Sequence, residues 1–350
     1  MRMLFTSGTA RGGTNFRTLL LSGHPAVAMS IDPFIPLFRC YRDALLKAAG
    51  ISHPASGVLD DYYYDQSKRE VMKAVQNTDP DVPFDPSEWE GLRAALASRM
   101  KLGSMNLIPR LDQLEGATFR EVFHSAMELV ASVKAGDVVW AGFNDNWAME
   151  FFRPLARLMP EAKFMLHLRD PRAVVASSEF AEPDARKRPT VLSFARHLRK
   201  YHAFAHVLQQ DALLRDRLCV TYYEPFLEDL EGQTRRMTDF LGLDFRPEMI
   251  DIARFRKADG TPWPSDWAIY RTSGDGWRKE MPQEMIELVE FVCSREMALH
   301  GYRREVYDPA SGLTPETLRY ALTNARECLH IRASGNNKTR SVSLRVKDAL

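Results

Sequence analysis

The sequence predicts an α/β protein with a central parallel sheet. Short apolar runs alternate along the 350-residue chain with segments of helical periodicity. Strands that alternate with helices lie parallel, because each connection carries the chain back across the sheet before the next strand begins. The first of these units consists of a strand, a glycine-rich loop and a helix, and the same order returns later in the chain.

The strands and helices of this sheet can be placed in order. The first strand is expected at residues 3–6, and a helical period begins at Phe16. The later elements are strand 138–141, helix 148–159, strand 163–168, a helix that begins at residue 171, strand 218–222 and helix 232–241. Gly242 follows the last helix and is the residue type that most often ends one.

A long helical insertion separates the first two of these strands. Residues 35–136 have mostly helical patterns broken by loops, with too few strand signals to extend the sheet. We expect this segment to form a cap beside the carboxyl edge of the sheet, where it would select the substrate. The sequence thus predicts a single domain over residues 1–334 that carries the cap, followed by a flexible tail over residues 335–350.

Charge and apolar patterning exclude several classes of protein. The chain has 47 Lys and Arg residues against 46 Asp and Glu residues, a formal net charge of +1. Because nucleic acids and anionic membranes attract basic surfaces, we expect neither as a partner, and any bound anion must be held by a local site. The apolar stretches are shorter than the roughly 18 residues of a membrane span, so a soluble protein is expected.

The N-terminus and the cysteines indicate a cytoplasmic protein. Few apolar residues precede Ser7, which is too short a run for the core of a signal peptide. The four cysteines, Cys40, Cys219, Cys293 and Cys328, are far apart and form no C-x-x-C pair. Neither a zinc site nor a redox motif is therefore expected.

The loop from Ser7 to Asn15 has the composition of an anion site. Gly12 and Gly13 allow backbone N–H groups to close around an anion, and the helix that follows adds its positive end. The nucleoside-triphosphate loop G-x-x-x-x-G-K-[ST] has Lys after its last glycine, whereas this chain has Thr14 there and its cation earlier, at Arg11. The alternative is an ordinary tight turn between strand and helix.

A second basic position follows strand 163–168. Arg169 ends this strand, Pro171 occupies the first position of the next helix, and Ser177 lies eight positions after the arginine. A guanidinium at a strand end and a hydroxyl on the next helix can bind one further phosphate. The alternative is that Arg169 and Asp170 only cap a helix at the surface.

Together these motifs resemble the sulfotransferases that use 3′-phosphoadenosine 5′-phosphosulfate (PAPS), nearest in style to the bacterial, tyrosylprotein and carbohydrate members. The resemblance rests on segments that occur in the family's order: 10–15 (ARGGTN), Arg169-Asp170-Pro171 with Ser177, 221–226 (TYYEPF), 240–243 (FLGL) and 276–279 (GWRK). It implies a P-loop-like three-layer sandwich and transfer of a sulfuryl group from PAPS without a metal.

The resemblance also implies roles for individual residues. The 5′-phosphosulfate would be held by the first loop, and the 3′-phosphate by Arg169 and Ser177. A loop with Arg278 and Lys279 would close over the 3′-phosphate, and Tyr222 or Tyr223 would lie against the adenine. The residues of the first loop with this role are Arg11, Gly12, Gly13, Thr14 and Asn15.

Two positions depart from the family pattern. Ungapped alignment from His24 places Asp32 where related enzymes have a glutamate base, so Asp32 is the candidate base, with a simple turn residue or His24 as alternatives. Asn144 stands where tyrosylprotein sulfotransferases have a lysine near the transferred group. Either Arg11 and the helix dipole then stabilise the charge alone, or a cap residue supplies a cation, or the acceptor differs.

The sequence thus predicts a PAPS-dependent sulfotransferase that acts on a hydroxyl or amine. A P-loop kinase or nucleotide hydrolase is the first alternative, and an inactive nucleotide-binding protein of the same fold is the second. The acceptor is expected to be a small molecule or a carbohydrate, and the even charge balance favours a small or neutral one.

Overall fold

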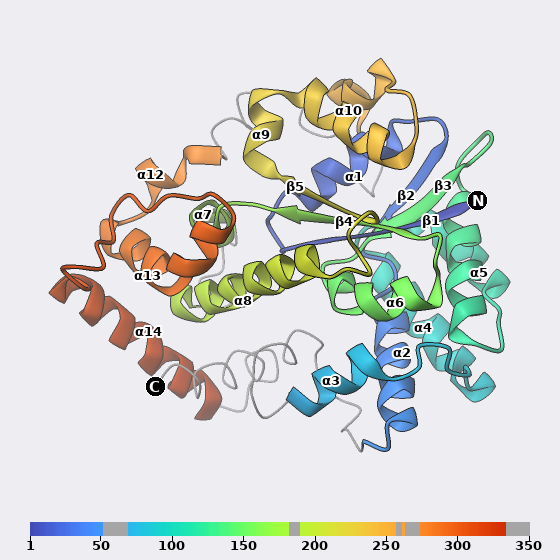
Figure 1. Ribbon diagram of the computed structural model, residues 1–350, viewed down its shortest axis with the longest axis horizontal. Coiled ribbons are helices and arrows are strands. Elements are labelled where there is room, and N and C mark those ends of the chain that lie inside the picture. The colour runs from blue at the N-terminus through green and yellow to red at the C-terminus, as the bar shows by residue number, and fades with distance from the viewer. Residues whose placement is uncertain (52–68, 182–189, 257–260, 263–273, 334–350) are drawn as a thin grey trace. The chain divides into compact units, whose positions relative to one another are not determined.

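The computed structural model describes residues 1–51, 69–181, 190–256, 261–262 and 274–333 (Figure 1). The chain forms two compact units. The first unit comprises Met1–Ser56, Glu70–Leu168 and Gln209–Asp266. The second unit comprises Gly57–Arg69, Arg169–Leu208 and Trp267–Leu350.

The first unit contains a five-stranded sheet in which every pair is parallel. Its strands, in the spatial order β2-β3-β1-β4-β5, are β1 (Arg2–Gly8), β2 (Val27–Ile31), β3 (Trp140–Asn144), β4 (Lys163–Leu168) and β5 (Leu218–Tyr222). The register sets Asn144 opposite both Thr6 and Ile31, so these strands end close together at their carboxyl ends. The predicted α/β class with a central parallel sheet is confirmed.

Helices cover both faces of this sheet, which gives three layers. Figure 1 shows α1 (Thr14–Ser22) and α10 (Leu230–Leu241) on one side, and α5 (Phe119–Ala131) and α6 (Phe152–Leu158) on the other. The other helices of this unit are α2 (Ile35–Ala48), α3 (Arg69–Asn77), α4 (Trp89–Met100) and α9 (Tyr223–Glu228).

Aromatic rings fill the layer between the sheet and α5. The ring of Phe5, in the central strand, lies 6.0 Å from that of Phe123 on α5 and 5.5 Å from that of Phe143 on β3. Phe34 and Phe38 pack on Phe143 with centroids 4.8 and 5.8 Å apart. Because each buried aromatic side chain removes a large apolar area from water, this layer is a main part of the core.

The sheet differs from the sequence expectation in one strand and in the place of the cap. β2 was not expected, because its five residues (VAMSI) form an edge strand with a polar Ser30 and partly exposed Met29 and Ile31. β3 begins at Trp140 and not at residue 138, and Val139 is 40% exposed. Within the 35–136 insertion, α5 packs against β2 and β3. This part of the insertion therefore covers a face of the sheet and is not a cap at its edge.

The second unit is helical in its described residues. It contains α7 (Pro171–Ala181), α8 (Val191–Gln210, of which the last two residues belong to the first unit), α12 (Trp277–Glu280), α13 (Gln283–Leu299) and α14 (Pro315–Ala333). α13 packs against α7 and α14, and α12 packs against α7. The apolar contacts include Val174, Leu198 and Val289. The expected tail over residues 335–350 lies outside the described residues.

A fully buried histidine lies inside this unit. Nδ1 of His202, on α8, is 2.8 Å from the carbonyl oxygen of Leu198, and Nε2 is 3.1 Å from that of Arg169. Burial, aided by the neighbouring His300, lowers the pKa of His202 to about 4. The imidazole is therefore neutral in the folded state at pH values where an unfolded chain would already protonate it.

We expect His202→Gln to reduce the acid sensitivity of the fold. Below pH 6.5 the His202 side chain is protonated in the unfolded state, whereas in the folded state it stays neutral down to about pH 4. The free energy of unfolding of the wild type therefore falls between these two pH values. The loss by pH 4 is about 3 kcal/mol from this group. Urea unfolding at pH 6.5 and pH 4 measures it. The exposed His124→Gln serves as control, and an equal acid loss in the wild type and His202→Gln would contradict the prediction.

Candidate functional site

The carboxyl ends of the strands bring four of the predicted site elements to one edge of the first unit. The glycine loop follows β1, Asp32 follows β2, Asn144 ends β3 and Tyr223 follows β5. β1 lies in the middle of the sheet, and the strands that follow it in the chain lie on both sides. The strand order therefore reverses next to β1. In an open parallel sheet, ligands usually bind at the carboxyl ends of the strands beside such a reversal.

The glycine loop has a backbone that only glycine fits at its centre. Gly13 has φ +88°, and a Cβ atom built there would lie 2.4 Å from Cδ2 of Tyr223. A Cβ atom at Gly12 would lie 2.6 Å from Oγ1 of Thr9. The N–H of Gly12 donates to the carbonyl oxygen of Thr9 at 2.9 Å. The exposed Arg11 also has a positive φ of 63°, which adds strain at the tip of the loop.

The loop leads directly into the uncapped N-terminus of α1. Gly13 is the N-cap residue, no side chain of a described residue caps the helix, and no acidic residue occupies its first turn. The first backbone N–H groups of a helix have no partner within it and carry a partial positive charge. Together with Thr14, Asn15 and the nearby Arg11, they make a suitable site for a phosphate or sulfate group.

Arg17, a buried arginine on α1, lies beside Asn144, where related enzymes have a lysine. The motifs in the sequence do not predict this cation. Nη2 of Arg17 donates to Oδ1 of Asn144 at 2.8 Å, and Nη1 donates to the carbonyl oxygen of Ser7 at 3.3 Å. Arg17 is fully buried. The cation beside Asn144 thus comes from α1 and not from the insertion. The signal in the sequence is an arginine within the apolar segment 16–21 of this helix.

Asp32 lies at the end of β2 in a conformation that side chains rarely adopt. Its φ is 49°, and its N–H donates to the carbonyl oxygen of Asn144 at 2.6 Å. Nε of Arg99, on α4, donates to the Asp32 carbonyl oxygen at 3.1 Å, and Nη2 lies 3.5 Å from the carboxylate. Burial raises the pKa of Asp32, while Arg99 opposes this rise. The insertion therefore supplies a cation next to the candidate base.

The other predicted residues of this edge have mainly structural contacts. The buried Tyr223 lies beneath Gly13, and its ring meets that of His167 edge-on at 6.2 Å. His24 accepts from the N–H of Ala26 at 3.0 Å and lies 3.0 Å from the carbonyl oxygen of Asp244. Both nitrogens of His24 thus contact backbone groups, which argues against His24 as the base.

In the second unit, the predicted phosphate-binding residues lie around the start of α7. Arg169 is buried, and its carbonyl oxygen is the partner of His202 described above. Ser177 is partly exposed on α7. Asp170 binds Arg172 in a bidentate pair, with Nε 3.0 Å from Oδ1 and Nη2 2.6 Å from Oδ2. Asp170, the nearest candidate for a magnesium ligand in the kinase alternative, is therefore engaged by an arginine.

Arg172 connects this region to the segment with Arg278 and Lys279. Its Nη1 lies 2.5 Å from Oε1 of the buried Glu290. The guanidinium of Arg172 lies 4.0 Å from the ring centroid of Trp277, and that of Arg278 lies 4.5 Å from the same centroid. Arg278 and Lys279 are exposed, and Arg278 forms an ion pair with Glu305. These stacked guanidinium groups place both basic residues beside α7.

Within the part of the chain that the structure describes, no group of three or more His, Cys, Asp and Glu side chains could hold a metal ion. No helix among these residues is long and apolar enough to cross a membrane.

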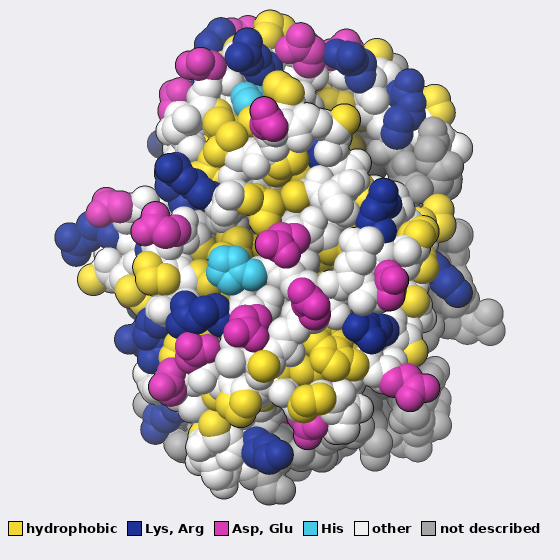
Figure 2. All heavy atoms as spheres, turned by 90° about the vertical axis from the view of Figure 1, so that its right-hand side faces the viewer, with side chains coloured by type: hydrophobic (Ala, Val, Ile, Leu, Met, Phe, Trp, Pro, Cys, Tyr) yellow, Lys and Arg dark blue, Asp and Glu magenta, His cyan; other side chains and the backbone are white. Residues whose placement is uncertain are grey.

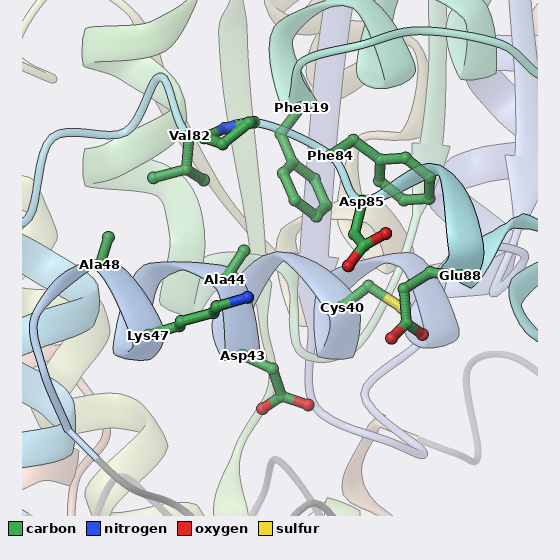
Figure 3. Close-up of a pocket in the computed structure, with 11 residues that line it drawn as sticks. Cys40, Asp43, Ala44, Lys47, Ala48, Val82, Phe84, Asp85, Glu88 and Phe119 are labelled. Carbon is green, nitrogen blue, oxygen red and sulfur yellow. The ribbon is translucent and has the colours of Figure 1, made fainter.

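A cavity of about 540 Å³ lies beside α2 in the first unit (Figure 3). Its walls are the α2 face with Cys40 and Ala44, the segment around Phe84, and Phe119 of α5. Burial raises the pKa of the Cys40 thiol to about 11, and the nearby Glu88 carboxylate adds to this. Cys40 is therefore a protonated packing residue at neutral pH and not a nucleophile.

Comparison with curated proteins finds no match. Among solved structures, the sulfotransferase domain from the curacin biosynthetic pathway is 14% identical over 87% of this chain and 98% of its own, with a TM-score of 0.49. The sulfotransferase from Alicyclobacillus acidocaldarius is 16% identical over 85% of this chain and 94% of its own, with a TM-score of 0.45.

Retinol dehydratase in complex with retinol and PAP is 15% identical over 85% of this chain and 82% of its own, with a TM-score of 0.39. The model of the sulfotransferase family matches residues 4–247, a segment that includes the glycine loop, Asp32, Asn144, Arg169 and Ser177. This match covers more than half of the chain, and the chain therefore belongs to the sulfotransferase family.

Proposed function

We propose that this sulfotransferase uses PAPS as its donor and transfers the sulfuryl group to a hydroxyl or amine of a small or neutral acceptor. The observation that carries the proposal is the uncapped N-terminus of α1 behind a glycine loop, at the carboxyl edge of the sheet. When bound, PAPS would supply the sulfuryl group, with adenosine 3′,5′-bisphosphate as the leaving group through its 5′-phosphate oxygen.

The chain offers separate groups for the two anionic ends of such a donor. In the first unit, the loop amides, Arg11, Thr14 and Asn15 would hold the 5′-phosphosulfate. In the second unit, Arg169, Ser177, Arg278 and Lys279 would hold the 3′-phosphate. A role of Arg278 requires that its guanidinium exchanges Glu305 for the phosphate. Tyr223 contacts Gly13, so its role would combine support of the loop with contact to the adenine.

Asp32 is the proposed base. It would accept the proton of the acceptor group as the new oxygen–sulfur or nitrogen–sulfur bond forms and the bond to the leaving phosphate breaks. Arg11 and the N-terminus of α1 would stabilise the charge that grows on this phosphate. Asn144, which is held by Arg17, would donate a hydrogen bond from its amide toward the transferred group.

The charge distribution favours a small or neutral acceptor over a long polyanion. Basic and acidic side chains are interspersed with apolar ones over the face that Figure 2 presents. The chain as a whole has a net charge of only +1. A polyanionic acceptor would be attracted by a broad basic surface, and the face in Figure 2, on the side of the N-terminus, does not offer one among its described residues. For the edge with the candidate site, the preference rests on the low net charge.

Calorimetry distinguishes this proposal from a kinase or nucleotide hydrolase. Thr14 replaces the lysine that reaches a triphosphate, and Asp170 is paired with Arg172. We expect the chain to bind adenosine 3′,5′-bisphosphate more tightly than ATP. Tight binding of ATP with no heat from the bisphosphate would contradict the proposal.

We expect Arg169→Ala and Arg11→Ala to affect two nucleotides differently. Loss of a charge-assisted contact of about 1.5 to 3 kcal/mol corresponds to roughly a 10- to 150-fold weaker Kd. Arg169→Ala should weaken the binding of adenosine 3′,5′-bisphosphate but leave the binding of adenosine 5′-phosphate unchanged. Arg11→Ala should weaken the binding of both nucleotides. Because Arg169 is buried, its substitution could also disturb the fold. Ser177→Ala is a milder variant that tests the same 3′-phosphate site. Equal losses for both nucleotides in Arg169→Ala would remove the 3′-phosphate assignment.

We expect Asp32→Asn to abolish transfer while the nucleotide still binds. An amide cannot take the acceptor's proton, but Asp32 follows β2 and is not part of the loop after β1 that would hold the phosphate. Transfer of ³⁵S from labelled PAPS to a panel of alcohols, phenols and amines measures the activity. If the wild type binds the bisphosphate but labels no acceptor, the inactive nucleotide-binding alternative would be favoured. Full activity of Asp32→Asn would exclude Asp32 as the base.

A further inference from the structure

A second carboxyl group lies next to Asp32. The parallel register of β2 and β3 pairs Ile31 with Asn144, so that Asp32 and Asp145 follow directly on paired residues. Neighbouring strands lie about 4.8 Å apart. The hydrogen bond from the Asp32 N–H to the Asn144 carbonyl oxygen continues this pairing by one further residue. The two aspartates are therefore neighbours at the carboxyl edge of the sheet.

Both carboxyl groups have a buried oxygen with no hydrogen-bond partner among the described residues. Asp145 is completely buried, and its Oδ2 has no hydrogen-bond partner among the described residues. Its Oδ1 receives a long contact of 3.5 Å from the N–H of Trp147, and the backbone of Phe34 also lowers the pKa of this carboxyl group. Oδ1 of Asp32 likewise has no partner among these residues. Two ionised carboxylates here would bury two unpaired anionic oxygens, which is costly.

Among the described residues, Arg99 is the cation that forms an ion pair with one of these carboxyl groups, that of Asp32. Its Nη2 lies 3.5 Å from Oδ2 of Asp32, and its Nε donates to the backbone oxygen of the same residue. The other cations on adjacent helices have different partners. Arg17 donates to Asn144 and Ser7, and the guanidinium of Arg39 lies 5.7 Å from the ring centroid of Trp147.

One cation beside the half-buried carboxyl group of Asp32 and the buried one of Asp145 stabilises one negative charge and not two. Two like charges on neighbouring, poorly hydrated carboxyl groups disfavour each other. Burial raises the pKa of Asp145 well above its ordinary value, and the negative charge of Asp32 raises it further. The charge of Arg99 lowers the pKa of both carboxyl groups against the effect of burial, and its ion pair is with Asp32.

We propose that Asp145 keeps its proton while Asp32 is ionised, and that Arg99 of the insertion determines which of the two carries the charge. Asp145 and Arg99 are then positioning residues for the base, and in this respect the proposal rests on the proposed function. A neutral Asp145 leaves a single carboxylate at the site. The insertion thus contributes to the ionisation of the base through one guanidinium.

Carboxyl ¹³C NMR on the full chain tests the proposal without any acceptor. The protein is labelled with aspartate that carries ¹³C at the carboxyl carbon, and chemical shifts are followed from pH 4 to pH 9. Asp32→Asn and Asp145→Asn assign the two signals. We expect the Asp145 signal to remain that of a protonated acid at pH values where the Asp32 signal is that of a carboxylate. An Asp145 signal that titrates at or below the pH of Asp32 would overturn the proposal.

Arg99→Met tests the role of the guanidinium, with Arg93→Met on the same helix as control. Arg93 donates to the backbone oxygens of Leu111, Asp112 and Leu114 and not to either aspartate. We expect Arg99→Met to move the Asp32 titration to higher pH, while Arg93→Met leaves it in place. An unchanged Asp32 titration in Arg99→Met would overturn the assignment of the charge.

Thermal unfolding gives a second measurement for Asp145. A folded state that holds a proton on Asp145 loses stability as the pH rises above the ordinary aspartate value of 3.8 and through the raised pKa. Asp145→Asn removes this loss, so its melting temperature relative to the wild type should rise between pH 5 and pH 8. A difference in melting temperature between Asp145→Asn and the wild type that stays constant with pH would contradict the proposal. If these results hold but no acceptor is labelled with ³⁵S, only the proposed function fails.

Discussion

Backbone N–H groups at the start of a helix have no partners inside it, and at α1 no side chain of the described residues takes their place. The surrounding structure keeps this helix end open. Gly13 adopts a left-handed conformation in contact with Tyr223, and Gly12 packs on Thr9. The loop can follow this path because neither glycine has a Cβ atom, so the N–H groups stay directed at one position. The central place of β1 then sets this position at the edge where the other strands end.

Buried and half-buried arginines connect distant segments of the chain within each unit. Arg17 joins α1 to Asn144 across 127 positions of sequence, and Arg99 joins the insertion to Asp32 across 67. In the second unit, Arg172 joins the start of α7 to Glu290 on α13. The planar guanidinium binds several acceptors at once, which suits it to such junctions. Each arginine thus connects two segments of the chain and also places a positive charge near a candidate site.

The parts of the fold that could be predicted are those with a local signal. β4 and β5 have the predicted bounds, because each is an apolar run that polar residues bound on both sides. β2 could not be predicted from its five residues, since its pairing with β3 is set by the packing of α5 on both strands. The glycine loop was visible because glycines and the strand-to-helix junction are adjacent in sequence. Arg17, Arg99 and Asp145 were missed because only the folded chain brings them to their partners.

The most direct test of the account compares two glycine substitutions in the first unit. Gly13 and Gly242 both have positive φ, of 88° and 70°, so alanine is strained at either position. A Cβ atom would contact Tyr223 at Gly13, while nothing lies within 4 Å of one at Gly242. The measurement is calorimetric binding of adenosine 3′,5′-bisphosphate to both folded variants. We expect Gly13→Ala to lose most of its affinity and Gly242→Ala to keep that of the wild type. Unchanged binding by Gly13→Ala would contradict it.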